Sequence, residues 1–264
     1  WLPTLQALNN QAPVFLRTNR LRTRREALLR QLTEAGFVVE PVAQLPDGIV
    51  MVERKNIFRS EAFKEGAFEV QDGASQMIAP LLQIEPGQRV VDACAGAGGK
   101  TLHIASLMQN KGKILALDLH EHKLDELKKR AARDRVDIIE TKIIEGTKTI
   151  KRLENSADRL LLDVPCTGLG VLRRNPDCKW KLKESEVESL RSTQAEILQN
   201  YCKILKVGGL MVYATCSILP SENQGQVEKF LSANSNWELL EQKTFTPEKD
   251  GFDGFYAAVF KRLS

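Results

Sequence analysis

The sequence predicts an α/β fold, in which a parallel β-sheet is covered by helices on both faces and a small α+β unit precedes it. Short apolar runs alternate with helical segments from residue 86 onward, which is typical of parallel strands joined by helices. A glycine-rich turn separates the first such run from its helix. The 264 residues, 42% of them hydrophobic, are enough to bury a substantial core, so we expect a soluble globular protein.

The first part of the chain has short elements of both kinds. A strand is predicted at 14–17, a helix at 24–35 that Gly36 ends as a C-cap residue, and strands at 37–42 and 49–53. A further helix at 74–82 ends before Pro86–Gly87, where the main domain is expected to begin its sheet. We therefore divide the chain into residues 1–70 and 71–264.

The main domain is predicted to contain four strands and four helices. In the last part, Gly208–Gly209 is expected to separate a long helix from its strand, and Pro220 or Ser221 to open the final helix with Glu222 in its first turn, where carboxylates are favoured. The strands are 89–93, 113–118, 159–164 and 210–214; the helices are 100–108, 122–133, 184–205 and 222–233.

Charge and hydropathy exclude some classes of protein and favour others. No apolar run approaches the roughly 20 residues of a membrane helix, so we expect no membrane partner. The net charge of +4 only mildly favours a polyanion as binding partner.

Because the chain begins with Trp1 rather than Met and shows no signal peptide, we expect further sequence to precede it. Two basic clusters are candidate nucleic-acid contacts or simply solvated faces: Arg17, Arg20, Arg22, Arg24 and Arg25; and Arg173, Arg174, Lys179, Lys181 and Lys183, with Trp180 among them.

The cysteines and histidines predict neither a disulfide framework nor a metal site. Five cysteines without a CxxC pair or a secretory signal indicate reduced thiols and a cytoplasmic protein. The three histidines stand at no zinc-ligand spacing that a cysteine completes, so no metal is predicted. Cys178 and Cys202 are interpreted as packing residues.

The glycine-rich turn, residues 92–101, predicts a nucleotide-type pocket. It opens a helix directly after a strand, so its backbone can approach a ligand closely, although close helix packing would also select glycines. It has neither the full GxGxxG spacing nor the P-loop spacing, which disfavours a nucleoside triphosphatase. Asp118, at the end of the next strand, is placed to bind both ribose hydroxyls of S-adenosylmethionine or NAD. Cys94 is interpreted as a small wall residue.

Two further cysteines follow apolar strands on different loops. Cys166 ends Asp163-Val164-Pro165-Cys166, and Cys216 lies in Ala214-Thr215-Cys216-Ser217. Cytosine C5 is too weak a carbon nucleophile to accept a methyl group unaided, but thiolate addition at C6 makes it electron-rich. One thiol suffices for the attack, and a second close by can serve the release step. The pair therefore indicates a pyrimidine methylase.

With these motifs together, the chain resembles the Sun/Fmu (NSUN) family of RNA cytosine-C5 methyltransferases, and most resembles the bacterial small-subunit ribosomal RNA enzymes of the RsmB type. The resemblance runs almost the full length of the chain. Its most specific parts are the Cys166 loop with its continuation Gly170–Asp177, and the Cys216 loop with Pro220–Asn223; weaker parts are Phe15–Asn19, Val70–Ser75 and Asp253–Ala257.

The resemblance implies a Rossmann-like class I S-adenosylmethionine-dependent methyltransferase domain after an RRM-like or ferredoxin-like subdomain. Cys216 would be the nucleophile on C6, Cys166 would assist adduct breakdown, and Asp163 would contact the base and the methionine end of the cofactor. Asp118 would hold the ribose and Glu145 the adenine. The cofactor loop would comprise Cys94, Ala95, Gly96, Ala97, Gly98, Gly99 and Lys100. Two departures are Ala97 in place of the usual proline and Glu145–Gly146 in place of Asp-Gly.

The substrate that this resemblance implies is RNA, with 16S rRNA favoured and transfer RNA an alternative. Arg173, Arg174 and Lys179 are the candidate RNA contacts, and the target cytosine should lie in a loop or be flipped out. RsmB-type enzymes also carry a NusB-like RNA-binding domain that is not in this sequence, so weaker RNA binding is expected. We expect a monomer. A non-catalytic ribosome assembly factor and a methylase of protein or small molecules are the competing hypotheses.

Overall fold

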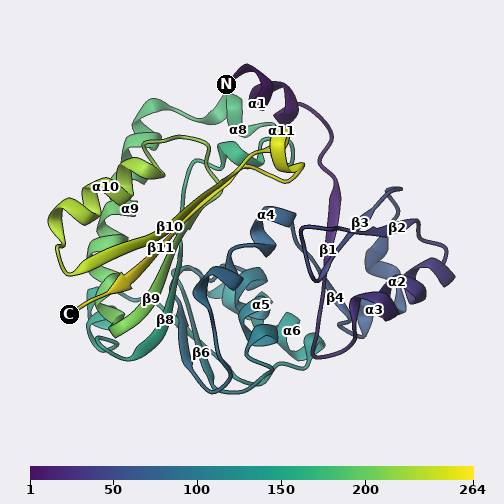
Figure 1. Cartoon of the computed structure of the whole chain (residues 1–264), viewed down its shortest axis with the longest axis horizontal. Helices are drawn as coiled ribbons and strands as arrows, with labels where there is room; N and C mark the ends of the chain where they lie inside the picture. The colour runs from purple at the N-terminus through teal and green to yellow at the C-terminus, as the bar shows by residue number, and fades with distance from the viewer.

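A computed structural model describes all 264 residues and contains two β-sheets. The smaller sheet has the order β2-β3-β1-β4 and is antiparallel, and the larger has the order β10-β11-β9-β8-β5-β6-β7. Figure 1 shows the small sheet with α2 and α3 at one side of the molecule and the large sheet between two layers of helices. No helix is long and apolar enough to span a membrane.

The small sheet packs its own hydrophobic core. The predicted strand at 14–17 and helix at 24–35 are present, and their apolar side chains Leu16, Leu28 and Leu32 are fully buried together with Ile49 and Phe68. A strand at 68–70 was not predicted. The elements are α1 (Leu2–Leu8), β1 (Val14–Thr18), α2 (Arg25–Glu34), β2 (Val39–Pro41), β3 (Gly48–Met51), a 3-10 turn (Ile57–Arg59), α3 (Glu61–Lys64) and β4 (Phe68–Val70).

The large sheet confirms the α/β class, but it is mixed rather than wholly parallel. Strands β5 to β9 are parallel, whereas β11 pairs antiparallel with β9 and β10 with β11. This C-terminal hairpin and β7 were not predicted from the sequence. The strands are β5 (Arg89–Asp92), β6 (Lys113–Asp118), β7 (Ile139–Ile143), β8 (Ala157–Asp163), β9 (Leu205–Thr215), β10 (Trp237–Phe245) and β11 (Phe255–Arg262).

Alternate residues of each parallel strand enter different cores. Leu161 packs on the same side as α5 and α6, whereas its neighbours Leu160 and Leu162 face α9 and α10, because successive side chains point to opposite faces of a sheet. Both cores are fully buried, which explains the continuous apolar runs in the sequence. The helices are α5 (Gly99–Leu107), α6 (Glu121–Asp134), α7 (Thr147–Lys151), α8 (Cys178–Lys181), α9 (Glu184–Tyr201), α10 (Gln224–Ala233) and α11 (Pro247–Asp250).

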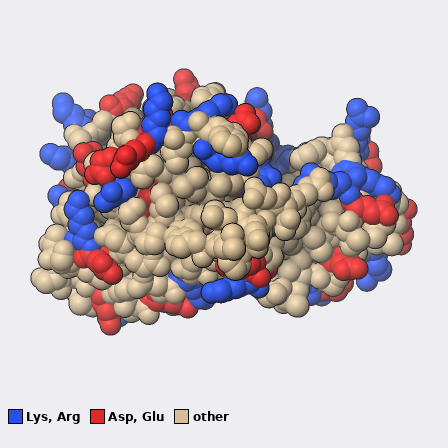
Figure 2. Space-filling view, turned by 90° about the horizontal axis from the view of Figure 1, so that it is seen from above, with Lys and Arg blue, Asp and Glu red and all other residues tan.

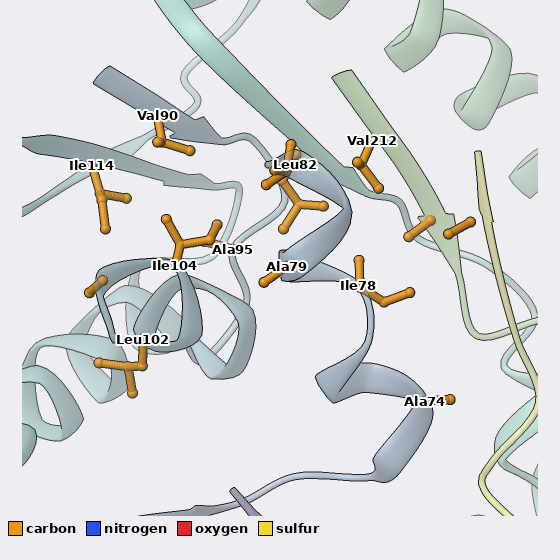
Figure 3. Packing of buried hydrophobic residues seen from close by; sticks show 14 of the residues in the cluster. Ala74, Ile78, Ala79, Leu82, Val90, Ala95, Leu102, Ile104, Ile114 and Val212 are labelled. Carbon is orange, nitrogen blue, oxygen red and sulfur yellow. The ribbon is translucent and has the colours of Figure 1, made fainter. Parts of the chain in front are cut away.

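The predicted continuous helix at 74–82 is wrong. The segment forms one turn, α4 (Gly73–Gln76), and then a 3-10 turn at Ala79–Leu82. Pro80 has no backbone N–H to donate and cannot continue the regular hydrogen-bond pattern. Figure 3 shows that Ile78, Ala79 and Leu82 of this segment lie between α5 and the strand that carries Val212. Because the helix is interrupted, this short segment can pack into the space between the large sheet and α5.

Two boundaries near the C-terminal half also differ from the prediction. Helix α9 ends at Tyr201, a 3-10 turn covers Cys202–Ile204, and Gly208–Gly209 lie inside β9 instead of before it. Gly209 packs against Leu205, where a Cβ would come within 2.8 Å of that side chain. The last helix begins at Gln224, so Glu222 is not in its first turn but buried ahead of it.

Residues of the N-terminal part of the chain contact the large domain at two places. Helix α1 packs against α11, with Thr4 Oγ1 donating to Glu248 Oε1 at 2.9 Å. Glu69 of β4 is almost fully buried and pairs with Arg130 and Arg133 of α6. Figure 2 shows a hollowed boundary between the two lobes, with Lys and Arg interspersed among Asp and Glu on this face. The division at residue 70 remains a prediction.

We expect Gly73→Ala to lower the free energy of unfolding by about 1–3 kcal/mol, because overpacking a rigid core is destabilising. An added Cβ would lie 2.2 Å from the ring of Phe252, which packs edge-to-face on Phe15 at 5.3 Å and has little room to move. Chemical denaturation measures the change. Gly225→Ala in α10 is the control, since its nearest neighbour would be 3.3 Å away. Equal losses in both variants would contradict the packing argument.

Candidate active site

The carboxyl ends of the parallel strands gather the predicted site residues at one edge of the large sheet. The strand order reverses at β5, which lies between β8 and β6, and ligands of such sheets bind at this point. Asp92, Asp118 and Asp163 end β5, β6 and β8, and Cys216 follows β9 directly. Since Asp163 lies opposite Ala214 in the β8–β9 ladder, the two cysteine loops leave the sheet at the same level.

The two candidate thiols are in contact. Cys166 Sγ and Cys216 Sγ lie 3.4 Å apart, and both side chains are partly buried. The hydrogen bond from Cys166 lowers the pKa of Cys216, aided by Lys100 and opposed by burial and by Asp163. The same hydrogen bond, with burial, raises the pKa of Cys166 well above its usual value. Ionisation is therefore favoured at Cys216, and Cys166 keeps its proton to a higher pH.

A partly buried ion pair lies beside Cys216. Lys100, in the first turn of α5, places its Nζ 2.6 Å from Asp163 Oδ2 and 5.0 Å from the centroid of the Phe255 ring. Burial alone would lower the pKa of Lys100, but the attraction of Asp163 and their hydrogen bond outweigh it and raise that pKa. Lys100 was predicted as a cofactor-loop residue, and the structure places its ammonium with Asp163 and the thiols.

The glycine loop has the geometry of a nucleoside site. Gly96 and Gly98 have φ of +55° and +90°, which strongly favour glycine. Gly96 N–H donates to Asp118 Oδ2 and His120 N–H to Asp118 Oδ1, both at 2.9 Å, so the carboxylate is held at the strand end. A Cβ on Gly96 would meet nothing within 4 Å, so the loop faces open space. These residues fit a ribose held by Asp118.

Hydrogen bonds of neighbouring polar side chains hold the glycine loop in place. Thr101 Oγ1 donates to Asp92 Oδ2 at 2.7 Å, while burial raises the pKa of Asp92 to about 7. Burial also raises the pKa of Cys94 well above its usual value, which fits a wall residue rather than a nucleophile. Arg130 of α6 donates to Ala97 O at 2.7 Å and to Glu69, so the position of the loop depends on a residue of β4.

Glu145 is less closely tied to the loop. It follows β7, whose Ile143 pairs with Asp118, and it is exposed. No hydrogen bond or ion pair joins it to residues 94–100. Its role at the adenine stays a prediction.

Arg173 and Arg174, two of the predicted RNA contacts, are paired within the protein, and their role at RNA stays a prediction. Arg173 Nε lies 2.6 Å from Asp253 Oδ1, and its side chain is only 5% exposed. Arg174 pairs with the same buried Asp253 and, at 2.9 Å, with Asp72. Both guanidinium groups are paired with carboxylates and join the Cys166 loop to the C-terminal segment, Arg173 from a buried position and Arg174 from a side chain that is 32% exposed. Lys179 is exposed and makes no ion pair.

A cavity of about 600 Å³ opens between the Cys166 loop and α8. Trp180 on α8 is 82% exposed, which is unusual for the largest apolar side chain, and Lys179 Nζ lies 5.3 Å from its ring centroid. Side chains of both charge signs line the cavity, because the carboxylates of Asp177 and Glu186 lie there together with basic residues. It is lined by Thr167, Arg174, Asn175, Pro176, Asp177, Cys178, Lys181, Leu182 and Glu186.

Two residues hold the cysteine loops together through contacts that the sequence did not indicate. Gly170 N–H donates to Cys216 O at 2.9 Å, and a Cβ there would lie 2.0 Å from Gly254 O. Glu222 is fully buried and accepts hydrogen bonds from both loops. Only the folded chain reveals these contacts, because neither spacing nor residue type distinguishes them.

Comparisons with known proteins place these features in a family. A family model described as 16S rRNA methyltransferase RsmB/F matches residues 79–261, and a model of the ferredoxin-like domain of RsmF/B-like methyltransferases matches residues 1–57. Ribosomal RNA small subunit methyltransferase B of Serratia proteamaculans is 36% identical over 270 residues, covering 99% of this chain and 62% of the relative. A probable enzyme of the same name from Synechocystis is 37% identical over 280 residues, covering 98% and 62%.

Solved structures agree in fold. A methyltransferase homologue from Pyrococcus horikoshii superposes with a TM-score of 0.88 at 26% identity, covering 99% of this chain and 90% of that one. NSun6 from the same organism, solved with SFG, gives a TM-score of 0.90 at 21% identity, covering 100% and 94%, which shows the fold alone. The chain spans about 62% of the length of the curated relatives. On the family match, which covers most of the chain, it belongs to the RsmB/F family of 16S rRNA methyltransferases.

Proposed function

We propose that the protein methylates C5 of a cytosine in RNA with S-adenosylmethionine as methyl donor, and that 16S rRNA is the substrate. The observation that carries this proposal is the contact of two thiols, 3.4 Å apart, beside a partly buried lysine–aspartate pair at the carboxyl edge of the sheet. A methylase of protein or small molecules has no chemical need of this pair. Family membership supports the RNA class of substrate.

The cofactor supplies an electrophilic methyl group when bound. The residues that would hold it are the loop 94–100, with Asp118 at the ribose and Glu145 at the adenine. Asp163 has one oxygen bonded to Lys100, and its Oδ1 makes no hydrogen bond within the protein. It lies between the cofactor loop and Cys216 and can face the cytosine edge. A proton donated near N3 by Lys100, which Asp163 holds in place, would favour thiolate addition at C6.

The thiols divide the chemistry between them. The Cys216 thiolate adds to C6, and the C5–C6 double bond supplies the electron pair that accepts the methyl group. C5 then loses its proton to solvent, the electron pair of that C–H bond re-forms the C5–C6 double bond, and the C6–sulfur bond breaks with its pair returning to Cys216 as thiolate. Cys166 donates a hydrogen bond to the leaving sulfur and so stabilises that thiolate. The aromatic base is thereby restored.

The cavity beside α8 is the proposed entry for RNA. It is lined by Thr167, which follows Cys166, and by Cys178 and Lys181, which flank the exposed Lys179 and Trp180 in sequence. Unstacked bases bind to exposed aromatic rings, and lysine ammonium groups bind phosphate. We propose Lys179 as an RNA contact and Trp180 as a surface on which a nucleotide near the target stacks.

Lys100→Met should slow alkylation of Cys216 at neutral pH by about tenfold, because a cation that stabilises its thiolate is removed. In the wild type, the lowered pKa means that the alkylation rate of Cys216 reaches its plateau at a lower pH than that of an ordinary cysteine. Mass spectrometry of iodoacetamide-treated protein over a pH series measures this. An unchanged pH profile in the variant would show that Lys100 does not act on the thiol.

Cys216→Ala should abolish both turnover and the covalent RNA complex, because no thiolate remains to add to C6. Cys166→Ala should instead accumulate the complex, because its release is slowed. A denaturing gel with labelled 16S rRNA and S-adenosylmethionine measures both. Cys202→Ala, a buried thiol outside both the thiol pair and the RNA-entry cavity, is the control. Turnover by Cys216→Ala would make the assigned roles wrong.

Lys179→Gln should weaken binding to 16S rRNA several-fold and reduce the slope of log affinity against log salt by about one. Lys229→Gln, which removes the same charge from α10, should change neither quantity. Filter binding at several salt concentrations measures both variants. If the two substitutions had equal effects, the α8 segment would not be the RNA contact.

A further inference from the structure

Glu222 is the most deeply buried carboxylate near the thiols, and the mechanism above leaves it without a role. It lies just before α10, and none of its surface is exposed. An ionised carboxylate is costly to bury unless hydrogen bonds satisfy its oxygens. Here both oxygens are satisfied. Oε1 accepts from Thr167 N–H and Gln194 Nε2, each at 2.9 Å; Oε2 accepts from Thr167 Oγ1 at 2.6 Å and from Ser217 Oγ.

The donors come from both cysteine loops. Thr167 directly follows Cys166, and Ser217 directly follows Cys216, so one carboxylate accepts hydrogen bonds from the residue after each thiol. Thr167 Oγ1 and Ser217 Oγ also lie 3.1 Å from each other. The Glu222 backbone is itself fixed, because Tyr213 Oη donates to its carbonyl oxygen at 2.6 Å. Two loops 50 residues apart in sequence therefore share one buried anchor.

We propose that Glu222 is a positioning residue that fixes the two thiols at contact distance and keeps the proton on Cys166, so that Cys216 is the thiolate. The role in catalysis rests on the proposed function. The proposal adds the group that makes the two cysteines unequal.

The charges around the pair support this inequality. Lys100, from α5, acts on Cys216, whereas the carboxylate of Glu222 acts on Cys166 and adds to the effects of the shared hydrogen bond and burial in raising the pKa of Cys166. Asp163, at the end of β8, opposes ionisation of Cys216 but is paired with Lys100. Tyr213 of β9 stays neutral, since burial raises its pKa well above its usual value. The Glu222 carboxylate thus adds to the hydrogen bond, the burial and the charge of Cys216 in disfavouring a thiolate at Cys166.

Glu222→Gln separates charge from shape. The amide has nearly the same size, and the hydroxyls of Thr167 and Ser217 can rotate to accept as well as donate hydrogen bonds. We expect the ratio of Cys216 to Cys166 alkylation at pH 7 to fall about tenfold, because one nearby charge is worth about one pKa unit. Peptide mass spectrometry after brief iodoacetamide treatment measures this ratio in the protein alone, without RNA or cofactor.

Gln226→Leu is the matched control. Gln226 is a buried side chain of α10 that donates to Arg191 O and Ser221 O and makes no hydrogen bond to Glu222 or to the residues that follow the two cysteines, Thr167 and Ser217. Its removal should lower the thermal midpoint without changing the alkylation ratio. If Glu222→Gln lowered the midpoint and left the ratio unchanged, Glu222 would have a merely structural role and the proposal would be overturned.

Ser217→Ala tests the positional half of the proposal. It keeps the Glu222 charge but removes the hydrogen bond on the Cys216 side, so the alkylation ratio should remain within about twofold. Oxidised glutathione forms a mixed disulfide with the Cys216 thiolate and releases glutathione thiolate. Cys166 then displaces the second glutathione and forms the Cys166–Cys216 disulfide. This closure should slow several-fold in Ser217→Ala, because closure rates fall steeply when reacting atoms lose alignment. Closure at the wild-type rate would contradict the positional role.

Methyl transfer to 16S rRNA by Glu222→Gln connects this role to the reaction. We expect kcat to fall about tenfold and KM for S-adenosylmethionine to stay unchanged, since Glu222 does not contact the cofactor loop. A fall confined to KM would overturn the assigned role. If the wild type itself transferred no methyl group, the proposed function would fail, whereas the thiol measurements would still decide the role of Glu222.

Discussion

The parallel pairing of β8 and β9 is the constraint on which the site depends. Asp163 lies opposite Ala214, and Val164 N–H donates to Ala214 O at 3.0 Å, so the two strands end together. A slip of one residue in this register would move every side chain to the other face of the sheet. The fully buried strands make such a slip costly. The pairing of the two strand backbones is therefore enough to bring Cys166 and Cys216 to the same edge of the sheet.

Buried charges then make the two thiols chemically different. A thiolate is destabilised by burial, and the structure offsets that cost with a hydrogen bond from Cys166 and with the nearby Lys100 cation. The Lys100–Asp163 pair is itself partly buried, and removing either partner leaves a charge without its counter-ion. On the other side, four hydrogen-bond donors stabilise Glu222. The Lys100 cation near Cys216 favours a thiolate there, and the Glu222 carboxylate near Cys166 disfavours one.

Sequence patterns predicted the parallel strands, the glycine loop and the thiols at strand ends because each is encoded locally. Asp118 and Asp163 could be placed from strand ends alone. The β10–β11 hairpin was missed because β10 exposes much of its length and lacks a continuous apolar run. Gly208–Gly209 looked like a boundary, yet β9 continues through them. Arg173 and Arg174 looked like a basic surface, and only the distant Asp253 and Asp72 show that they are paired within the protein.

The most direct test of the account is transfer of labelled methyl groups from S-adenosylmethionine to 16S rRNA, large-subunit rRNA and transfer RNA in parallel, followed by nucleoside analysis. The account predicts labelled 5-methylcytosine in 16S rRNA and none in the other two. Label in a different nucleoside, or measurable cofactor binding without transfer to any RNA, would contradict it.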